Sequence, residues 1–275
     1  MKKLIVIVIV MIAAFYYYLE HDRPDNVRIL RVGVECNFVP HNWEEDAASD
    51  SNVPIMNNPG FYAEGYDVQI AKLVAEKIGA QLIIMKIDWE ELLNALEHKR
   101  IDAIFSGMAD TEERKQRAAF TDTYEVSKAE YTVMVRKNSE YENAKSLSDL
   151  SGAAILGQKG TNFDTIIDQI PNVNHLEPAE TVPDMIARLM NKKTDGIVVN
   201  LDAGQSYERL YSTNLTLIRF PEGAGFDLGF VGTCAGVRKD DSKLLKDIND
   251  AINSITTRQR QRIMDQTISR VWKNL

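Results

Sequence analysis

Short apolar runs alternate along the first half of the chain with stretches that carry a helical spacing of apolar residues. The runs are typical of strands that are buried in a sheet, and they occupy residues 30–34, 82–85 and 101–105. Ile70, Val74 and Ile78 recur at four-residue spacing, which predicts a helix that begins near Tyr66 and ends at Gly79. This alternation of strands and helices predicts a parallel sheet with helices on its faces.

The same kind of pattern returns in the middle of the chain and defines a second α/β unit. It predicts strands at residues 131–135, 153–156 and 196–199, and helices at residues 162–170 and from residue 182 onward. Asn200 is expected to open the loop after the last of these strands. A strand at residues 229–237 and a long helical tail from Asp241 complete the chain. Two such units that face each other would form a cleft at the carboxyl ends of their strands, where ligands of open α/β sheets bind.

Helix caps and one long polar stretch punctuate this pattern. Asp88 with Glu91 has the spacing of a capping box, and Thr111, Thr161 and Thr181 stand directly before helical segments. Residues 37–62 are rich in Pro, Asn, Asp and Ser, which predicts a long loop that binds a ligand or is mobile.

The N-terminal segment and the net charge restrict the class of protein. Lys2 and Lys3 precede an apolar run at residues 4–19, which has the form of an export signal and is a little shorter than a membrane span. Both a cleaved signal peptide and an uncleaved membrane anchor remain open, and either places the protein outside the cytoplasm. The net charge of −8 argues against nucleic-acid binding, which needs clustered Lys and Arg.

The cysteines and histidines give no sign of a metal or a cofactor. Cys36 and Cys234 are the two cysteines, and two separate buried thiols are favoured over a disulfide, although export would permit one. The four histidines are scattered, so neither a metal site nor any cofactor is predicted. Gly152 and Gly157 have phosphate-loop spacing, but Gln158 stands where that motif needs Lys.

Taken in order, a set of short motifs resembles the polar amino-acid-binding group of bacterial extracellular solute-binding proteins, which serve ATP-driven importers. The likeness extends from Leu30 to Trp272 and is carried by residues 30–34, 65–68, 101–108, 111–114, 120–124, 147–152, 157–161 and 195–199. It implies the two-lobed α/β fold called periplasmic binding protein type 2. Lobe one is then discontinuous (residues 28–134 and 221–275), lobe two comprises residues 135–220, and residues 1–27 hold the signal or anchor and a linker.

The resemblance also implies the site. Arg114 matches the arginine that clamps the ligand α-carboxylate, and a guanidinium offers the planar fork that a carboxylate fits. The loop before it is expected to present its backbone and a hydroxyl to the ligand through Ser106, Gly107, Met108 and Ala109. Thr161 and Asn162 are expected to meet the carboxylate from lobe two, at the N-terminus of a helix.

Asn200 departs from the family pattern. Many relatives carry an Asp here, which pairs with the ligand α-ammonium, whereas Asn offers an acceptor without charge. We expect Asn200 to accept from the ammonium. The alternatives are compensation by Asp202 and a ligand that is not a standard α-amino acid.

The ligand side chain is expected to meet Glu35, Phe38 and Trp89, with Asn42 or Trp43 as further candidates. Glu35 resembles the acid of cation-binding relatives, and the two rings could hold a guanidinium or an alkyl stem. Arginine or lysine is therefore the favoured ligand.

The resulting hypothesis is a monomeric binding protein that delivers this amino acid to an ABC permease and performs no catalysis. The alternatives are an enzyme that resembles cyclohexadienyl dehydratase, with Glu35 as its acid, and a membrane-tethered amino-acid sensor.

Overall fold

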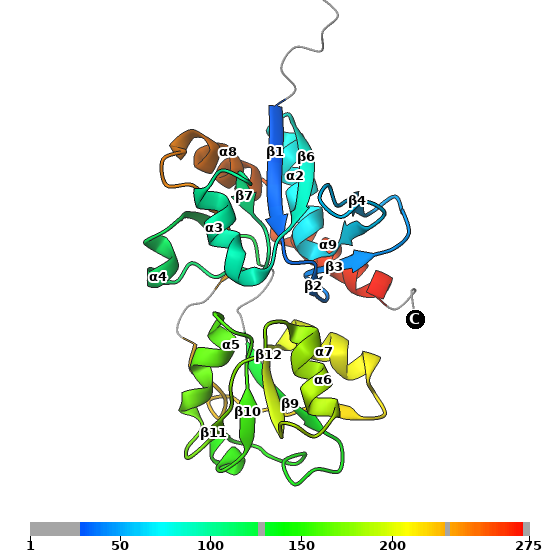
Figure 1. Cartoon of the computed structure of the whole chain (residues 1–275), viewed down its shortest axis with the longest axis vertical. Coiled ribbons are helices and arrows are strands. Elements are labelled where there is room, and N and C mark those ends of the chain that lie inside the picture. Colours follow the sequence, from blue (N-terminus) through cyan, green and yellow to red (C-terminus); the bar gives the residue numbers. More distant parts are fainter. Residues whose placement is uncertain (1–27, 126–129, 229–231, 272–275) are drawn as a thin grey trace, which may run out of the picture.

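The computed structural model describes residues 28–125, 130–228 and 232–271. Two lobes lie one above the other, and the N-terminal strand and the C-terminal helices share the upper one (Figure 1). We call the upper body lobe one and the lower body lobe two. The predicted signal or anchor at residues 1–27 lies outside the described residues. Among the helices that are described, none has the length and apolar character to span a membrane.

Lobe one is built on a mixed five-stranded sheet of order β6-β1-β7-β14-β8. Its strands are β1 (Arg28–Val34), β6 (Ala80–Lys86), β7 (Ala103–Ile104), β8 (Ala119–Thr123) and β14 (Cys234–Val237). β1 runs parallel to β6 and β7, while β14 returns antiparallel between β7 and β8. The helices of this lobe are α2 (Tyr66–Lys77), η1 (Trp89–Glu91), α3 (Leu92–Glu97), α4 (Glu112–Lys115), α8 (Ser242–Asn253) and α9 (Thr257–Val271).

Lobe two repeats this plan with a sheet of order β11-β10-β12-β9-β13. Its strands are β9 (Tyr131–Arg136), β10 (Ala154–Leu156), β11 (Asn174–His175), β12 (Gly196–Asn200) and β13 (Leu215–Leu217). Its helices are η2 (Leu147–Leu150), α5 (Asn162–Thr165), η3 (Ile166–Gln169), α6 (Val182–Met190) and α7 (Leu201–Leu210). Each lobe buries its own apolar core, so the predicted two α/β units are present.

The stretch predicted to be a long loop contains a small antiparallel sheet instead. It is built from β2 (Asn37–Phe38), β3 (Asn42–Glu45), β4 (Val53–Pro54) and β5 (Tyr62–Glu64). Strands of two to four residues are too short to show a clear alternation of apolar and polar residues in the sequence. Their stability comes from pairing with one another.

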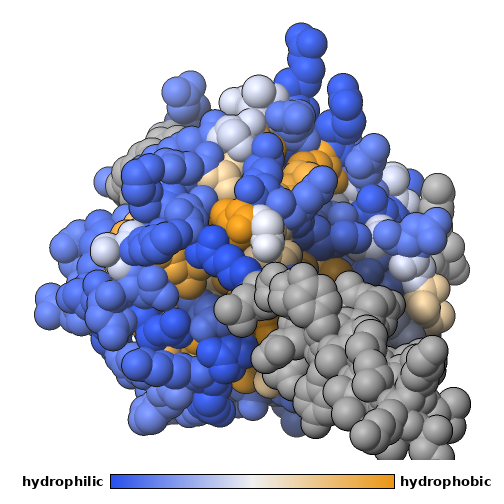
Figure 2. Space-filling model, turned by 90° about the horizontal axis from the view of Figure 1, so that it is seen from above, coloured by the Kyte–Doolittle hydropathy of each residue, from blue (hydrophilic) through white to orange (hydrophobic). Residues whose placement is uncertain are grey.

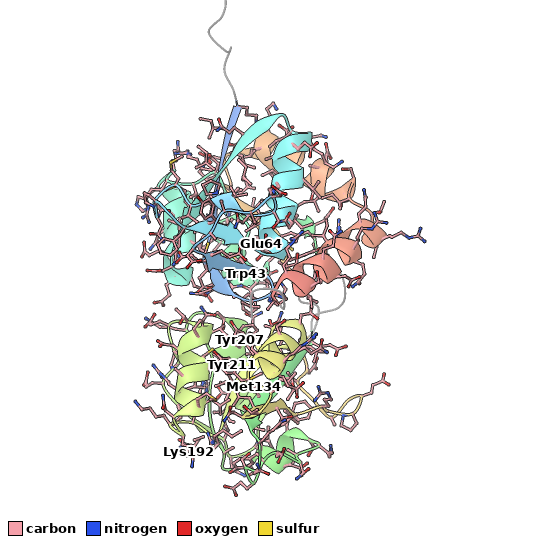
Figure 3. The ribbon with its side chains drawn as sticks, turned by 90° about the vertical axis from the view of Figure 1, so that its right-hand side faces the viewer. Trp43, Glu64, Met134, Lys192, Tyr207 and Tyr211 are labelled. Carbon is pink, nitrogen blue, oxygen red and sulfur yellow. The ribbon has the colours of Figure 1, made fainter. Side chains whose placement is uncertain are left out.

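The lobe boundaries differ from the predicted ones. β9 begins at Tyr131 and pairs with β12 and β13, so residues 131–134 lie in lobe two, where Figure 3 shows Met134 in the same lobe as Tyr207. Phe226 and Leu228 also pack on the core of lobe two. Lobe two therefore extends to residues 130–228 among the described residues. The sequence pattern predicts apolar strands, but the sheet that each strand joins depends on which other strands it pairs with.

Several local predictions, mostly of helix caps, can be compared with the structure. Thr111, Thr161 and Thr181 cap helices with their side chains, as predicted. Asp88 makes no such cap bond, and the predicted helix there begins as a 3-10 turn. The predicted strand at residues 229–237 is present from Cys234 on, while residues 229–231 lie outside the described part.

The two cysteines are free and buried, as favoured from the sequence. The coloured part of the upper face of lobe one is mostly hydrophilic with scattered apolar residues (Figure 2).

Candidate functional site

Arg114 lies between the two lobes. Thr111 caps α4 by accepting the backbone N–H of Arg114, which fixes the start of the side chain. The guanidinium is buried, with 9% of the residue exposed, and donates to Ala109 O at 2.9 Å and to Gly160 O of lobe two at 3.0 Å. It also lies 5.1 Å from the centre of the Trp89 ring, within cation–π range. Burial lowers the pKa of Arg114 from its usual value.

The loop of residues 157–161 brings lobe two to this guanidinium. It follows β10, and Thr161 at its end accepts the N–H of Phe163 as the cap of α5. Gly157 has no room for a side chain, because a Cβ there would lie 2.4 Å from the backbone nitrogen of Asp164. The carbonyl of Gly160 accepts from both Arg114 and the indole N–H of Trp89, the latter at 3.1 Å. The same carbonyl therefore joins two residues of lobe one to lobe two.

Glu35 supplies a buried carboxylate at another point of the same cleft. It follows β1, its backbone N–H donates to Ser106 Oγ at 3.0 Å, and the residue is 4% exposed. Its Oε1 accepts from Gln158 Nε2 of lobe two at 2.7 Å. Burial raises the pKa of Glu35 to about 7, since desolvation penalises the charged form.

These groups line one small cavity between the lobes. Nine residues predicted for the site line it: Glu35, Phe38, Trp89, Ser106, Gly107, Ala109, Arg114, Thr161 and Asn162. The structure thus brings together residues that lie up to 127 positions apart in the chain.

Met108 and Asn200 were also predicted for the site, and neither is among the lining residues. Met108 is buried in a satellite core with Leu92 and Leu96. Asn200 is the cap of α7, a helix that the sequence reading missed, and its amide oxygen accepts the N–H of Ala203 at 3.1 Å. Its amide nitrogen lies 3.0 Å from His41 Nε2 of lobe one.

The further candidates Asn42, Trp43 and Asp202 also lie outside the cavity lining. Asn42 is fully buried and links the N–H of Cys36 to a carboxylate oxygen of Asp67. Trp43 belongs to the small sheet of lobe one, near Glu64 in Figure 3, and its indole N–H donates to a carboxylate.

Three lining residues were missed: Tyr131, Gln158 and Phe163. Tyr131 packs edge-on against Phe163, with ring centroids 5.1 Å apart, and burial raises its pKa to about 12. In the sequence, Gln158 breaks a phosphate-loop motif and belongs to the family motif at residues 157–161, but it was not predicted for the site. Its place beside a loop already assigned to the site was the signal that could have found it.

Asn200→Ala is expected to lower the free energy of unfolding by about 0.5–2 kcal/mol, the usual cost of losing a side-chain cap. The cause is the lost acceptor for Ala203, together with the lost contact to His41. Urea unfolding would measure it, with Thr181→Ala, which removes the cap of α6, as the matched control. Unchanged stability would show that the cap contributes nothing.

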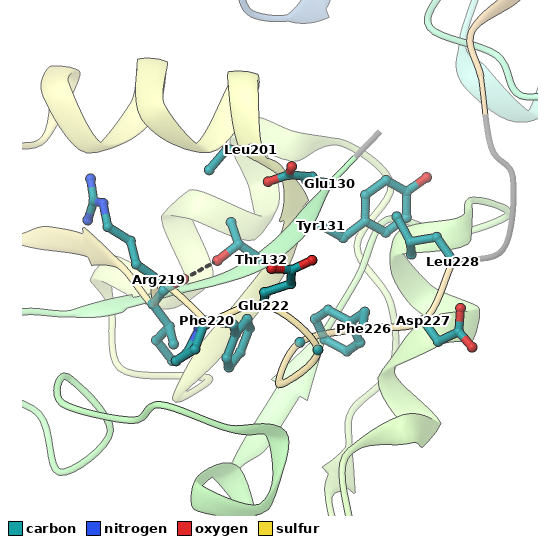
Figure 4. Close-up of a pocket in the computed structure, with 14 residues that line it drawn as sticks. Glu130, Tyr131, Thr132, Leu201, Arg219, Phe220, Glu222, Phe226, Asp227 and Leu228 are labelled. Atoms are coloured by element: carbon teal, nitrogen blue, oxygen red, sulfur yellow. Dashed lines mark hydrogen bonds between the residues drawn. The ribbon is translucent and has the colours of Figure 1, made fainter. Parts of the chain in front are cut away.

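A second hollow is a wider groove on lobe two. Glu130, Glu222, Phe220 and Phe226 surround it in Figure 4, and Tyr131 lines both this groove and the cleft cavity. Apart from Tyr131, none of the groove's described lining residues belongs to the cleft cavity. Within the described residues, no group of His, Cys, Asp and Glu side chains is arranged to hold a metal ion.

A cavity closed from both sides by separate α/β lobes is the arrangement of a two-lobed binding protein, which holds its ligand between the lobes. The family of bacterial extracellular solute-binding proteins, family 3, matches residues 30–269, and the chain belongs to this family.

Relatives of known specificity are distant but cover most of the chain. The histidine-binding periplasmic protein of Salmonella typhimurium is 26% identical over 235 residues, covering 81% of this chain and 80% of the relative. The arginine-binding extracellular protein ArtP of Bacillus subtilis is 26% identical over 206 residues, covering 74% and 76%. These relatives are solute-binding proteins, so the function shared with them is binding and not catalysis.

Solved structures confirm the predicted fold class. The substrate-binding protein of an amino acid ABC transporter matches with a TM-score of 0.72 and 25% identity, over 86% of this chain and 98% of that one. A mutant of the arginine-binding protein of T. maritima matches with a TM-score of 0.69 and 25% identity, over 88% and 95%.

Proposed function

We propose that this protein binds a polar amino acid with a cationic side chain, arginine or lysine, in the cleft and delivers it to an ABC importer. The observation that carries the proposal is the buried guanidinium of Arg114, which lies in the cavity between the lobes. Two of its five N–H donors bond to the carbonyls of Ala109 and Gly160. The remaining donors suit a ligand carboxylate, because the planar fork matches two carboxylate oxygens.

The other end of the ligand finds a carboxylate and aromatic rings. Glu35 is the only carboxylate among the described residues that line the cavity, and Phe38 and Trp89 line it with Glu35. An ionised Glu35 that is buried is stabilised by a cationic partner, and flat rings favour a guanidinium or an alkyl stem. The arginine-binding relative and structural neighbour support the same specificity.

Contacts from both lobes explain how binding would be coupled to closure. Gln158 reaches Glu35, and Gly160 reaches Arg114 and Trp89, so a ligand in this cavity touches both lobes at once. Such a ligand stabilises the closed arrangement more than an open one, and this difference drives closure. The closed protein then docks as a monomer on its permease, outside the cytoplasm, with residues 1–27 serving as signal or anchor.

A thermal-shift screen over the twenty amino acids, ornithine and citrulline tests the proposal. At a hundred times its dissociation constant, a ligand adds about 2.7 kcal/mol of stability, which raises the Tm of a chain this size by roughly 5–10 °C. Arginine or lysine is expected to give the largest shift. A screen in which no amino acid raises the Tm would contradict the proposal.

A further inference from the structure

The loop of residues 106–109 places the cavity's charged groups at opposite ends. The hydroxyl oxygen of Ser106 accepts a hydrogen bond from the backbone N–H of Glu35 at 3.0 Å. The backbone carbonyl of Ala109 accepts one from the guanidinium of Arg114 at 2.9 Å. Between them, Gly107 lies under the ring of Phe38, which a Cβ at that position would approach to 3.2 Å. From one end of this loop to the other, the cavity therefore presents a carboxylate, an aromatic ring and a guanidinium.

Lobe two repeats this polarity. Gln158 donates to the carboxylate of Glu35, while Gly160, two residues on, accepts from the guanidinium of Arg114. Three residue steps separate Ser106 from Ala109, so the two ends lie at most about 10 Å apart. A ligand whose carboxylate meets Arg114 can therefore reach Glu35 with a group at the far end of its chain.

An α-ammonium would lie at the Arg114 end, one carbon from the carboxylate. No described lining residue offers a carboxylate there. The carbonyl of Ala109 is bonded to Arg114, and that of Gly160 is bonded to Arg114 and Trp89. Asn200 uses its amide for Ala203 and His41. The ammonium would thus be buried near the guanidinium with no protein carboxylate beside it among the described lining residues, which is unfavourable.

From this charge arrangement we infer that the site recognises a carboxylate joined to one distal cation, so that ω-guanidino and ω-amino carboxylic acids without an α-ammonium are ligands of full affinity. The inference rests on the proposed function, because it assigns the carboxylate to Arg114 and the distal cation to Glu35. It goes further than the proposed function because it excludes the α-amino group from the ligand features that the site recognises.

Four compounds separate the ligand groups in calorimetric titrations of the full-length protein. L-arginine carries all three charges, 5-guanidinopentanoic acid lacks the α-ammonium, agmatine lacks the carboxylate, and L-norvaline lacks the guanidinium. We expect 5-guanidinopentanoic acid to bind within about threefold of arginine or more tightly, and agmatine and norvaline to bind more than about 30-fold more weakly.

Each outcome has a distinct meaning. Arginine that binds at least tenfold more tightly than 5-guanidinopentanoic acid overturns the inference and leaves the proposed function intact. Norvaline that binds more tightly than 5-guanidinopentanoic acid overturns it as well. If none of the four binds and no amino acid raises the Tm, the proposed function itself fails.

The variant Glu35→Gln tests the assignment of the distal cation independently. It is expected to weaken arginine and 5-guanidinopentanoic acid by the same factor and to leave norvaline unchanged, because only the first two carry a guanidinium. A loss confined to arginine and norvaline would assign Glu35 to the α-ammonium and overturn the inference.

Discussion

Arg114→Ala is expected to abolish measurable ligand binding while the protein remains folded. Removal of the guanidinium would leave a ligand carboxylate buried without a partner, at a cost of about 2–5 kcal/mol, or roughly 30-fold to several thousand-fold in Kd. The side chain also links Ala109 to Gly160 across the cleft, so its loss weakens the closed arrangement too. Calorimetric titration with the best ligand of the thermal-shift screen measures the effect, and circular dichroism verifies the fold.

Arg117→Ala provides the matched control. Arg117 lies three positions away and pairs with Glu97 on the surface of lobe one, outside the cavity. This variant should bind with the affinity of the unaltered protein. If Arg114→Ala also retained full affinity, the carboxylate would be held elsewhere and the proposed site would be incorrect.

Glu35→Gln is expected to weaken binding of arginine by about 1.5–3 kcal/mol, the usual worth of a hydrogen bond to a charged group. The amide keeps the size of the side chain and can still accept from Gln158, so the lost charge is the main change. Glu76→Gln, which alters an exposed acid of α2, is the control and should leave affinity unchanged.

The pH dependence of binding identifies the same group. The pKa of Glu35 is raised to about 7, and a cationic ligand favours its ionised form, so affinity should fall as the pH falls. Between pH 7 and pH 6 the decrease should be roughly fivefold, and it should vanish in Glu35→Gln. A decrease of equal size in the variant would assign the titration to another group.

Without ligand, the free energy of unfolding should depend on pH in the opposite sense to the binding affinity. Because burial raises the pKa of Glu35 above its unfolded value, its contribution to stability is complete below about pH 4.5 and is lost as the pH rises through 7. Without ligand, Glu35→Gln should therefore be more stable than the unaltered protein at pH 8 and similar to it at pH 4. The buried charge is a cost to folding that a cationic ligand offsets.

The sequence alone predicted the class of fold and nine of the residues that line the cleft cavity. Apolar runs and helical spacing predicted the two α/β units, because burial imposes those periods on any chain that forms such layers. The sequence also predicted the motif around Arg114 and the threonine caps. A cap can be predicted locally because it depends only on neighbouring residues.

The tertiary structure decided where chains from distant positions meet. It assigned residues 131–134 to lobe two and added Tyr131, Gln158 and Phe163 to the cavity. It also turned Asn200 toward Ala203 and His41. Strand pairing and side-chain direction depend on partners that are distant in the chain, such as Asn200 and His41, which lie 159 residues apart. A local sequence pattern does not contain this information. That assembly also brought Arg114 and Glu35, which the sequence places 79 positions apart, to the lining of one cavity.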